Sequence, residues 1–306
     1  MKEQSKNNLL LCDTETGMCE IPGTQATTED TNIAAAKKPV KLLYFTDPIC
    51  SSCWGIDPQL KKLALEYGPY FEIEYRMGGL LPSWEAYGGR DVNGPASVAQ
   101  HWEEAGAHYE MPIDGDLWLE DPLPSSYPPS IAFKAAQLQG EEKAVKFLRR
   151  IKEMIFMEKK NIARWDNLQQ AALETGLDAN QLKADYEGKA VQLFQEDLML
   201  ARQLGVRGFP TIFVTDGADN RILVYGSRPY EQYEQALLQL HPEAVKQPVD
   251  TAYTSLFATY PTLTTKEFAV LSGKKTSEAE AYLQELSDQG KIGKFASKNG
   301  ALWKKF

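Results

Sequence analysis

The stretch Asp47-Pro48-Ile49-Cys50-Ser51-Ser52-Cys53-Trp54 decides the fold of this chain. A short apolar run at residues 40–45 precedes it and predicts a buried strand. Apolar residues then recur at helical spacing through residues 56–65, which predicts a helix. Cys50 and Cys53 are therefore expected in the first turn of a helix that directly follows a strand.

This position of the two cysteines favours thiol–disulfide chemistry. A helix N-terminus carries unpaired N–H groups and a partial positive charge, which stabilise a thiolate. Cys50 is the predicted catalytic nucleophile, and Cys53, one turn further in, is the predicted resolving cysteine. Two alternatives stay open. In the first, Cys50 and Cys53 form half of a zinc site, and Cys12 and Cys19 supply the other two ligands. In the second, the C-x-x-C pair is an inert remnant in a protein that only binds a partner.

A second motif lies far away in the sequence, at Val206-Arg207-Gly208-Phe209-Pro210-Thr211-Ile212-Phe213-Val214. It places Pro210 at the beginning of an apolar strand, where a missing N–H donor is tolerated. A cis X-Pro bond at such a point makes a tight bend that faces a substrate. The alternative is a trans proline that merely begins an edge strand.

Composition narrows the choice of partners. The chain has 306 residues and a net charge of −9, without a long basic block, which argues against nucleic acid or an anionic membrane as the main partner. It contains no apolar run of about 18 residues or more, so no membrane span is predicted. Leu9-Leu10-Leu11 is too short for a secretory signal, so we expect a cytoplasmic protein. No cofactor or metal is predicted.

The order of the predicted elements indicates an α/β fold. A second strand is expected at residues 71–77, a helical block at 97–204, two strands at 211–214 and 221–225, and a helix at 230–240. This order predicts a thioredoxin-like fold with an all-helical insertion at about residues 84–205, in which helices cover both faces of a mixed sheet.

The chain is predicted to contain four parts. They are a mobile N-terminal segment (residues 1–38), a thioredoxin-like domain (39–241), a linker (242–250) and a small C-terminal domain (251–306).

The N-terminal segment has one notable feature, the compact loop Cys12-Asp13-Thr14-Glu15-Thr16-Gly17-Met18-Cys19. Its cysteines are incidental thiols, zinc ligands, or an accessory redox pair that exchanges with Cys50 and Cys53. The spacing between Cys12 and Cys19 is wider than in ordinary zinc knuckles, which disfavours zinc.

The C-terminal part is predicted to contain three helices followed by a hairpin. Helices are expected at residues 251–258 and 265–271. A third opens with a Ser277-x-x-Glu280 capping box, and Asn299-Gly300 is a strong hairpin turn. This pattern predicts a winged-helix-like domain. DNA binding is opposed by charge, because the third helix carries four carboxylates and no Lys or Arg, so protein contact or dimerisation is favoured.

The motifs together resemble the DsbA family of thiol–disulfide proteins and, within it, the SpxH/YjbH subfamily of ClpXP adaptors. The similarity rests on the Cys50–Cys53 stretch, on Gly78-Gly79-Leu80 and on Gly208-Phe209-Pro210-Thr211. It continues through Leu117-Trp118-Leu119-Glu120-Asp121-Pro122 and Phe156-Met157-Glu158-Lys159-Lys160-Asn161 and covers nearly the whole chain. The resemblance implies a DsbA-like fold and a protein partner, either a disulfide-bearing substrate or an Spx-like client with ClpXP.

The same resemblance implies that Phe209 and Pro210 bind the substrate chain, with Trp54 beside the cysteine pair. For Trp54, ordinary core packing is the alternative. The chain departs from the DsbA pattern because Ser51-Ser52 stands where DsbA oxidases have Pro-His, so we expect only a modest lowering of the pKa of Cys50. The leading hypothesis is a cytoplasmic thiol–disulfide oxidoreductase or isomerase, and the alternative is an adaptor that presents a client to ClpXP.

Overall fold

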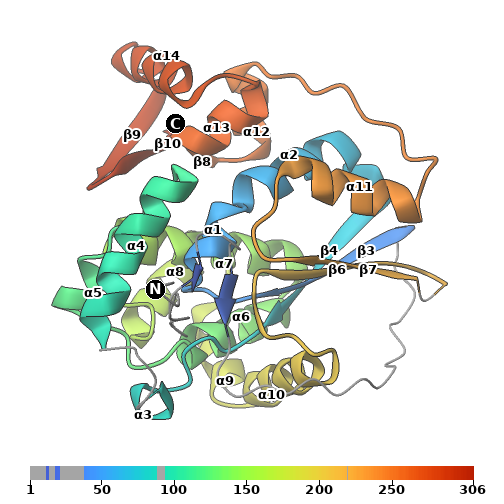
Figure 1. Cartoon of the computed structure of the whole chain (residues 1–306). Helices are drawn as coiled ribbons and strands as arrows, with labels where there is room; N and C mark the ends of the chain where they lie inside the picture. The colour runs from blue at the N-terminus through green and yellow to red at the C-terminus, as the bar shows by residue number, and fades with distance from the viewer. Residues whose placement is uncertain (1–11, 14–17, 21–37, 88–93, 219) are drawn as a thin grey trace, which may run out of the picture.

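The computed structural model of the chain describes residues 12–13, 18–20, 38–87, 94–218 and 220–306 (Figure 1). Most of the N-terminal segment that was predicted to be mobile lies outside these residues.

A four-stranded mixed sheet forms the centre of the molecule, in the order β4-β3-β6-β7. β3 runs parallel to β4 and antiparallel to β6, which in turn pairs antiparallel with β7. Every residue of β3 is buried, as the apolar run in its sequence predicts. All four predicted strands are confirmed: β3 Val40–Thr46, β4 Phe71–Met77, β6 Thr211–Asp216 and β7 Arg221–Tyr225.

The helix after the cysteine motif is divided in two, whereas the sequence predicted one. α1 (Ser51–Gly55) ends before α2 (Asp57–Tyr67) begins. A continuous helix would need Pro58 to donate a backbone N–H that proline lacks. The short helix η1 (Gly68–Tyr70) leads into β4, and α11 (Tyr230–Leu240) packs against α2 and the sheet.

The all-helical insertion between β4 and β6 is confirmed. It was predicted to end in one helix through residues 182–204, but Gly188 separates two helices there. Its members in the described residues are α3 Trp84–Tyr87, α4 Pro95–Tyr109, α5 Leu117–Glu120, α6 Tyr127–Gln137, α7 Glu141–Met157, α8 Trp165–Glu174, α9 Ala179–Tyr186 and α10 Lys189–Gln203.

The C-terminal part contains the three predicted helices and the predicted hairpin, together with a short strand that the sequence did not reveal. The sheet order is β8-β10-β9. The predicted Ser277–Glu280 capping box is wrong, because α14 begins at Thr276 and Glu278 accepts the N–H of Lys275 at 3.3 Å. The elements are α12 Tyr253–Thr259, β8 Thr262–Thr264, α13 Thr265–Ser272, α14 Thr276–Asp288, β9 Ile292–Ser297 and β10 Gly300–Lys305.

Two clusters of buried apolar side chains organise the described residues. The larger spans the central sheet and the helical insertion, and the smaller lies within the C-terminal part around Phe268, Leu283 and Trp303. Figure 1 shows the C-terminal part (orange and red) lying over α1, α2 and α4. Within the part of the chain that the structure describes, no helix combines the length and apolar composition needed to cross a membrane.

A third, very small sheet lies beside the cysteine motif. It has the order β1-β2-β5 and consists of β1 Cys12–Asp13, β2 Met18–Glu20 and β5 Gly208–Phe209. Residues 14–17, which join β1 to β2, are outside the described residues.

Candidate redox and peptide-binding site

Cys50 lies where the sequence predicts it, at the N-cap of α1. Its backbone is extended, and its Sγ accepts the N–H of Cys53 at 3.1 Å. The N–H of Trp54 donates to the carbonyl of Cys50 at 3.1 Å. The side chains of the two cysteines also hydrogen-bond to each other, so the two sulfur atoms are close enough for exchange within a C-x-x-C pair.

Both cysteine side chains are fully buried. Burial raises the pKa of the Cys50 thiol well above its usual range, although the N–H of Cys53 acts in the opposite direction. Burial also disfavours ionisation of Cys53, but the hydrogen bond from Cys50 and the charge of Lys152 outweigh it and lower the pKa of Cys53. The lowering of the Cys50 pKa that the sequence led us to expect is thus wrong for this conformation, because desolvation outweighs the hydrogen bond from the N–H of Cys53.

Asp47 connects the cysteine motif to two distant segments. Its carboxylate accepts the N–H of Ile49 at 3.1 Å, the N–H of Leu80 at 2.8 Å and the hydroxyl of Ser126 at 2.9 Å. Complete burial raises the pKa of Asp47 to about 6, and these hydrogen bonds limit the rise. The loop that carries Cys50 is therefore held against the segment that follows β4 and against the N-cap of α6.

The proline motif meets the same region from the other side. The Phe209–Pro210 peptide bond is cis, as predicted. The Phe209 ring fills the space beside Gly78, where a Cβ atom would lie 1.7 Å from the ring. Only glycine fits at this position without movement of Phe209, which explains the first glycine of the Gly78-Gly79-Leu80 motif.

Trp54 is fully buried, and its surroundings favour the core-packing alternative. Its Nε1 donates to the carbonyl of Pro112 at 3.1 Å, and its ring stacks on Phe156 with centroids 5.4 Å apart. The Arg149 guanidinium lies 4.4 Å from the centroid of the Trp54 ring. The tryptophan next to Cys53 is thus tied to the helical insertion.

One further side chain near the cysteines, Tyr109, was not predicted. Tyr109 of α4 donates to the hydroxyl of Ser52 at 3.0 Å, and its ring lies where a side chain at Gly55 would be. Burial raises the pKa of Tyr109 to about 12, so it remains a neutral donor. Ser52 and Tyr109 are 57 positions apart, so no local sequence pattern could have predicted their hydrogen bond.

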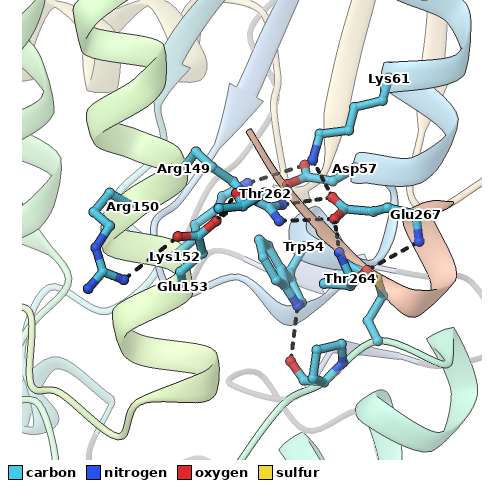
Figure 2. Close-up of polar contacts among 12 residues, drawn as sticks. Trp54, Asp57, Lys61, Arg149, Arg150, Lys152, Glu153, Thr262, Thr264 and Glu267 are labelled. Atoms are coloured by element: carbon cyan, nitrogen blue, oxygen red, sulfur yellow. Dashed lines mark hydrogen bonds and ion pairs between the residues drawn. The ribbon is translucent and has the colours of Figure 1, made fainter. Parts of the chain in front are cut away.

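A buried cluster of charged side chains extends from this site toward the C-terminal part (Figure 2). Lys152 of α7 is buried and lies 3.5 Å from the carboxylate of Asp57. Arg149, also on α7, contacts Glu153 at 2.8 Å and Glu267 of α13 at 2.7 Å. Sequence reasoning missed this cluster, because each charge alone is typical of a solvated helix face.

The accessory pair is described only through its backbone. Cys12 and Cys19 lie in β1 and β2, and their side chains are outside what the structure describes, so their predicted redox role stays a prediction. A separate group of carboxylates, Glu103, Asp114 and Asp116, contacts Lys298, which lies 2.9 Å from Glu103 and 2.7 Å from Asp116. That ammonium group compensates part of the negative charge there.

Comparison with known proteins places the chain in a family. The family model described as thioredoxin matches residues 43–235. The ClpXP adapter protein SpxH of Halalkalibacterium halodurans is 34% identical over 301 residues, which covers 96% of each chain. The chain belongs to the thioredoxin-like SpxH family.

Other relatives support this assignment. The ClpXP adapter protein SpxH of Bacillus subtilis is 32% identical to this SpxH-family chain, over 88% of the chain and 90% of the relative. Among solved structures, the cytosolic disulfide reductase DsbM from Pseudomonas aeruginosa aligns with a TM-score of 0.53 at 22% identity, over 66% of this chain and 98% of its own. This last likeness shows the fold, a DsbA-like arrangement of sheet and helical insertion.

Proposed function

We propose that this chain is an adaptor that binds a client protein and presents it to the ClpXP protease. The observation that carries the proposal is the similarity to the SpxH relative over 96% of both chains, which extends through the C-terminal part. A similarity confined to the thioredoxin-like region would favour an enzyme of that fold equally well. The client class that goes with the proposal is an Spx-like protein.

The burial of the two cysteines also favours an adaptor over a thiol–disulfide enzyme. A thiol–disulfide enzyme needs a nucleophilic sulfur that a substrate disulfide can reach. Cys50 and Cys53 are both fully buried, and Cys53 rather than Cys50 has the lowered pKa. An adaptor needs neither property.

The proposal includes a division into a thioredoxin-like domain (39–241), a linker (242–250) and a winged-helix-like domain (251–306). The two buried clusters support this division. The contacts of the C-terminal domain with the rest of the chain include those of Glu267 with Arg149 and the two hydrogen bonds that Asn299 exchanges with Ile113. We propose that it contributes to protein contacts, because the carboxylates of α14 disfavour nucleic acid. A cytoplasmic location without membrane contact goes with this role.

A degradation assay tests the adaptor proposal. Purified ClpXP is mixed with an Spx-like client from the same source, with and without the full chain. We expect degradation to accelerate severalfold and a stoichiometric complex of client and chain to form. The Cys50→Ser/Cys53→Ser variant should retain both properties. Absence of both complex formation and acceleration with the wild-type chain would overturn the proposal.

The second candidate function is thiol–disulfide exchange on protein substrates. It is favoured by the contact between the Cys53 N–H and the Cys50 Sγ at 3.1 Å. In that reaction the Cys50 thiolate attacks a substrate disulfide, and one substrate sulfur leaves as a thiol. Cys53 then attacks Cys50 and releases the second substrate sulfur. Phe209 and Pro210 are the proposed peptide contacts.

Covalent trapping in cells distinguishes the two functions. The Cys53→Ala variant of an enzyme accumulates mixed disulfides through Cys50, visible on non-reducing gels and identifiable by mass spectrometry. The Cys50→Ala/Cys53→Ala variant is the matched control. Adducts that need Cys50 support the enzyme, whereas a client that copurifies non-covalently with both variants supports the adaptor alone.

A further inference from the structure

The backbone of the N-terminal hairpin brings the second cysteine pair to the cysteine motif. β1 pairs antiparallel with β2, with Cys12 directly opposite Cys19. β2 in turn pairs antiparallel with β5, with Cys19 opposite Phe209 and Glu20 opposite Gly208. Cys19 is therefore the cysteine of the hairpin that stands next to the residue preceding Pro210.

The same strand also touches the helix that begins after Cys50. β2 contacts α1 (Ser51–Gly55), so the hairpin lies between the proline segment and the cysteine motif. Figure 1 shows the short dark-blue strands beside α1. Since β1 is the outer strand of the three, Cys12 is one strand further from β5 than Cys19, a spacing of about 4.8 Å.

The register within the hairpin suits a disulfide between its own cysteines. Residues directly opposite in an antiparallel pair have Cα atoms about 4.5–5.5 Å apart. Disulfides form between cysteines whose Cα atoms are about 4.4–6.8 Å apart. The register thus gives Cys12 and Cys19 a Cα separation of the size that a disulfide requires.

We propose that the hairpin is an internal exchange partner of the Cys50–Cys53 pair, with Cys19 and Cys50 as the two cysteines that meet. The backbone juxtaposition of β2 with β5 and α1 carries this proposal. Because β2 takes the edge of β5, a peptide strand that pairs there must first displace the hairpin. The inference goes beyond the adaptor function and does not depend on it.

The exchange balances without an outside reagent. The Cys50 thiolate attacks the Cys12–Cys19 disulfide at Cys19, a Cys19–Cys50 bond forms, and Cys12 leaves as a thiolate that takes up a proton. Cys53 loses its proton and attacks Cys50, a Cys50–Cys53 disulfide forms, and Cys19 leaves and is protonated. Two electrons pass from one pair to the other, and the reverse sequence follows the same steps.

Two full-length double variants test which cysteines meet. Cys12→Ser/Cys53→Ser leaves Cys19 and Cys50, and the matched control Cys19→Ser/Cys53→Ser leaves Cys12 and Cys50. Both are reduced, treated with a chelator, diluted to favour intramolecular reaction and oxidised with diamide, which takes up two electrons and two protons from the thiols. Peptide mapping without reduction then follows the disulfide over time.

We expect the Cys19–Cys50 disulfide to form at least about tenfold faster than the Cys12–Cys50 disulfide, because one strand spacing separates their positions. Equal rates in the two variants would show that the β1–β2 hairpin is not held beside β5 in solution, and they would overturn the proposal. Disulfides formed only between molecules would overturn it as well. Both variants carry Cys53→Ser, so any effect of that change on folding is common to both. The client-degradation assay is unaffected by either outcome, so the two proposals fail separately.

Discussion

Arg149 of the helical insertion makes two parallel hydrogen bonds to Glu267 of the C-terminal part, at 2.7 and 2.9 Å. Glu267 also accepts from Lys61 and from the N–H of Thr264, and it is fully buried. The same guanidinium lies over the ring of Trp54, next to Cys53. One carboxylate thus joins the C-terminal part to α2 and α7 beside the cysteine motif (Figure 2).

Replacing that carboxylate should cost much stability. Glu267→Gln removes the buried negative charge that Lys61 and Arg149 share, although Arg149 keeps its contact with Glu153. Breaking a buried ion pair from one side costs about 3–5 kcal/mol. We expect the free energy of unfolding in urea to fall by that amount. The control is Lys146→Gln, which removes an exposed pair with Glu142 and should leave the unfolding midpoint nearly unchanged. Equal effects of the two changes would contradict the importance assigned to Glu267.

Asp47 predicts a dependence of stability on pH. Its pKa is about 6 in the folded chain, against an ordinary value of 3.8, so the folded state binds the proton more tightly. The stabilisation from this proton is complete below about pH 4 and is lost as the pH rises through about 6. The gap between the two values corresponds to about 3 kcal/mol.

Denaturation of the wild type and Asp47→Asn at several pH values measures this effect. The variant has no proton to lose at this position, so only the wild type should lose this stabilisation as the pH rises. The unfolding free energy of the wild type minus that of the variant should therefore be larger at pH 4 than at pH 7. A difference that stays constant from pH 4 to pH 7 would refute the raised pKa of Asp47.

The parts of the fold that could be predicted are those encoded by neighbouring residues. β3 is a local apolar run, Cys50 and Cys53 share one helical turn, and the Asn299-Gly300 turn is a dipeptide signal. Pro210 could be placed because proline restricts its own position in a strand. Each of these features is present in a window of a few residues.

The parts that could not be predicted depend on contacts between distant residues. Arg149 and Glu267 are 118 positions apart, and the sequence of neither helix indicates that the two side chains form an ion pair. The raised pKa of Cys50 depends on burial, which the assembled chain determines rather than the helix terminus alone. The break after α1 could have been anticipated, because Pro58 is visible in the sequence and cannot donate to the preceding turn.

Asn299 should hold the C-terminal hairpin on the helical insertion. Its side chain accepts the N–H of Ile113 at 3.1 Å and donates to the carbonyl of the same residue at 2.6 Å. Asn299→Ala leaves both backbone groups of Ile113 without these partners, at a cost of about 1–3 kcal/mol. Limited proteolysis should then cut residues 242–250 faster than in the wild type. Ser297→Ala, which removes only an exposed bond within the hairpin, should be cut at the wild-type rate.

Gly78→Ala should displace Phe209 and the backbone beside Pro210, although residue 78 is far from them in the sequence. A Cβ atom at residue 78 would lie 1.7 Å from the Phe209 ring, so the ring and the backbone beside Pro210 must move. Overpacking of this kind costs about 1–3 kcal/mol. Gly68→Ala is the matched control, because a Cβ atom there meets no atom within 4 Å and its φ of −51° suits alanine. Urea denaturation should show a loss of stability for Gly78→Ala only. If the two variants are equally stable, Phe209 does not occupy the space beside Gly78 in solution.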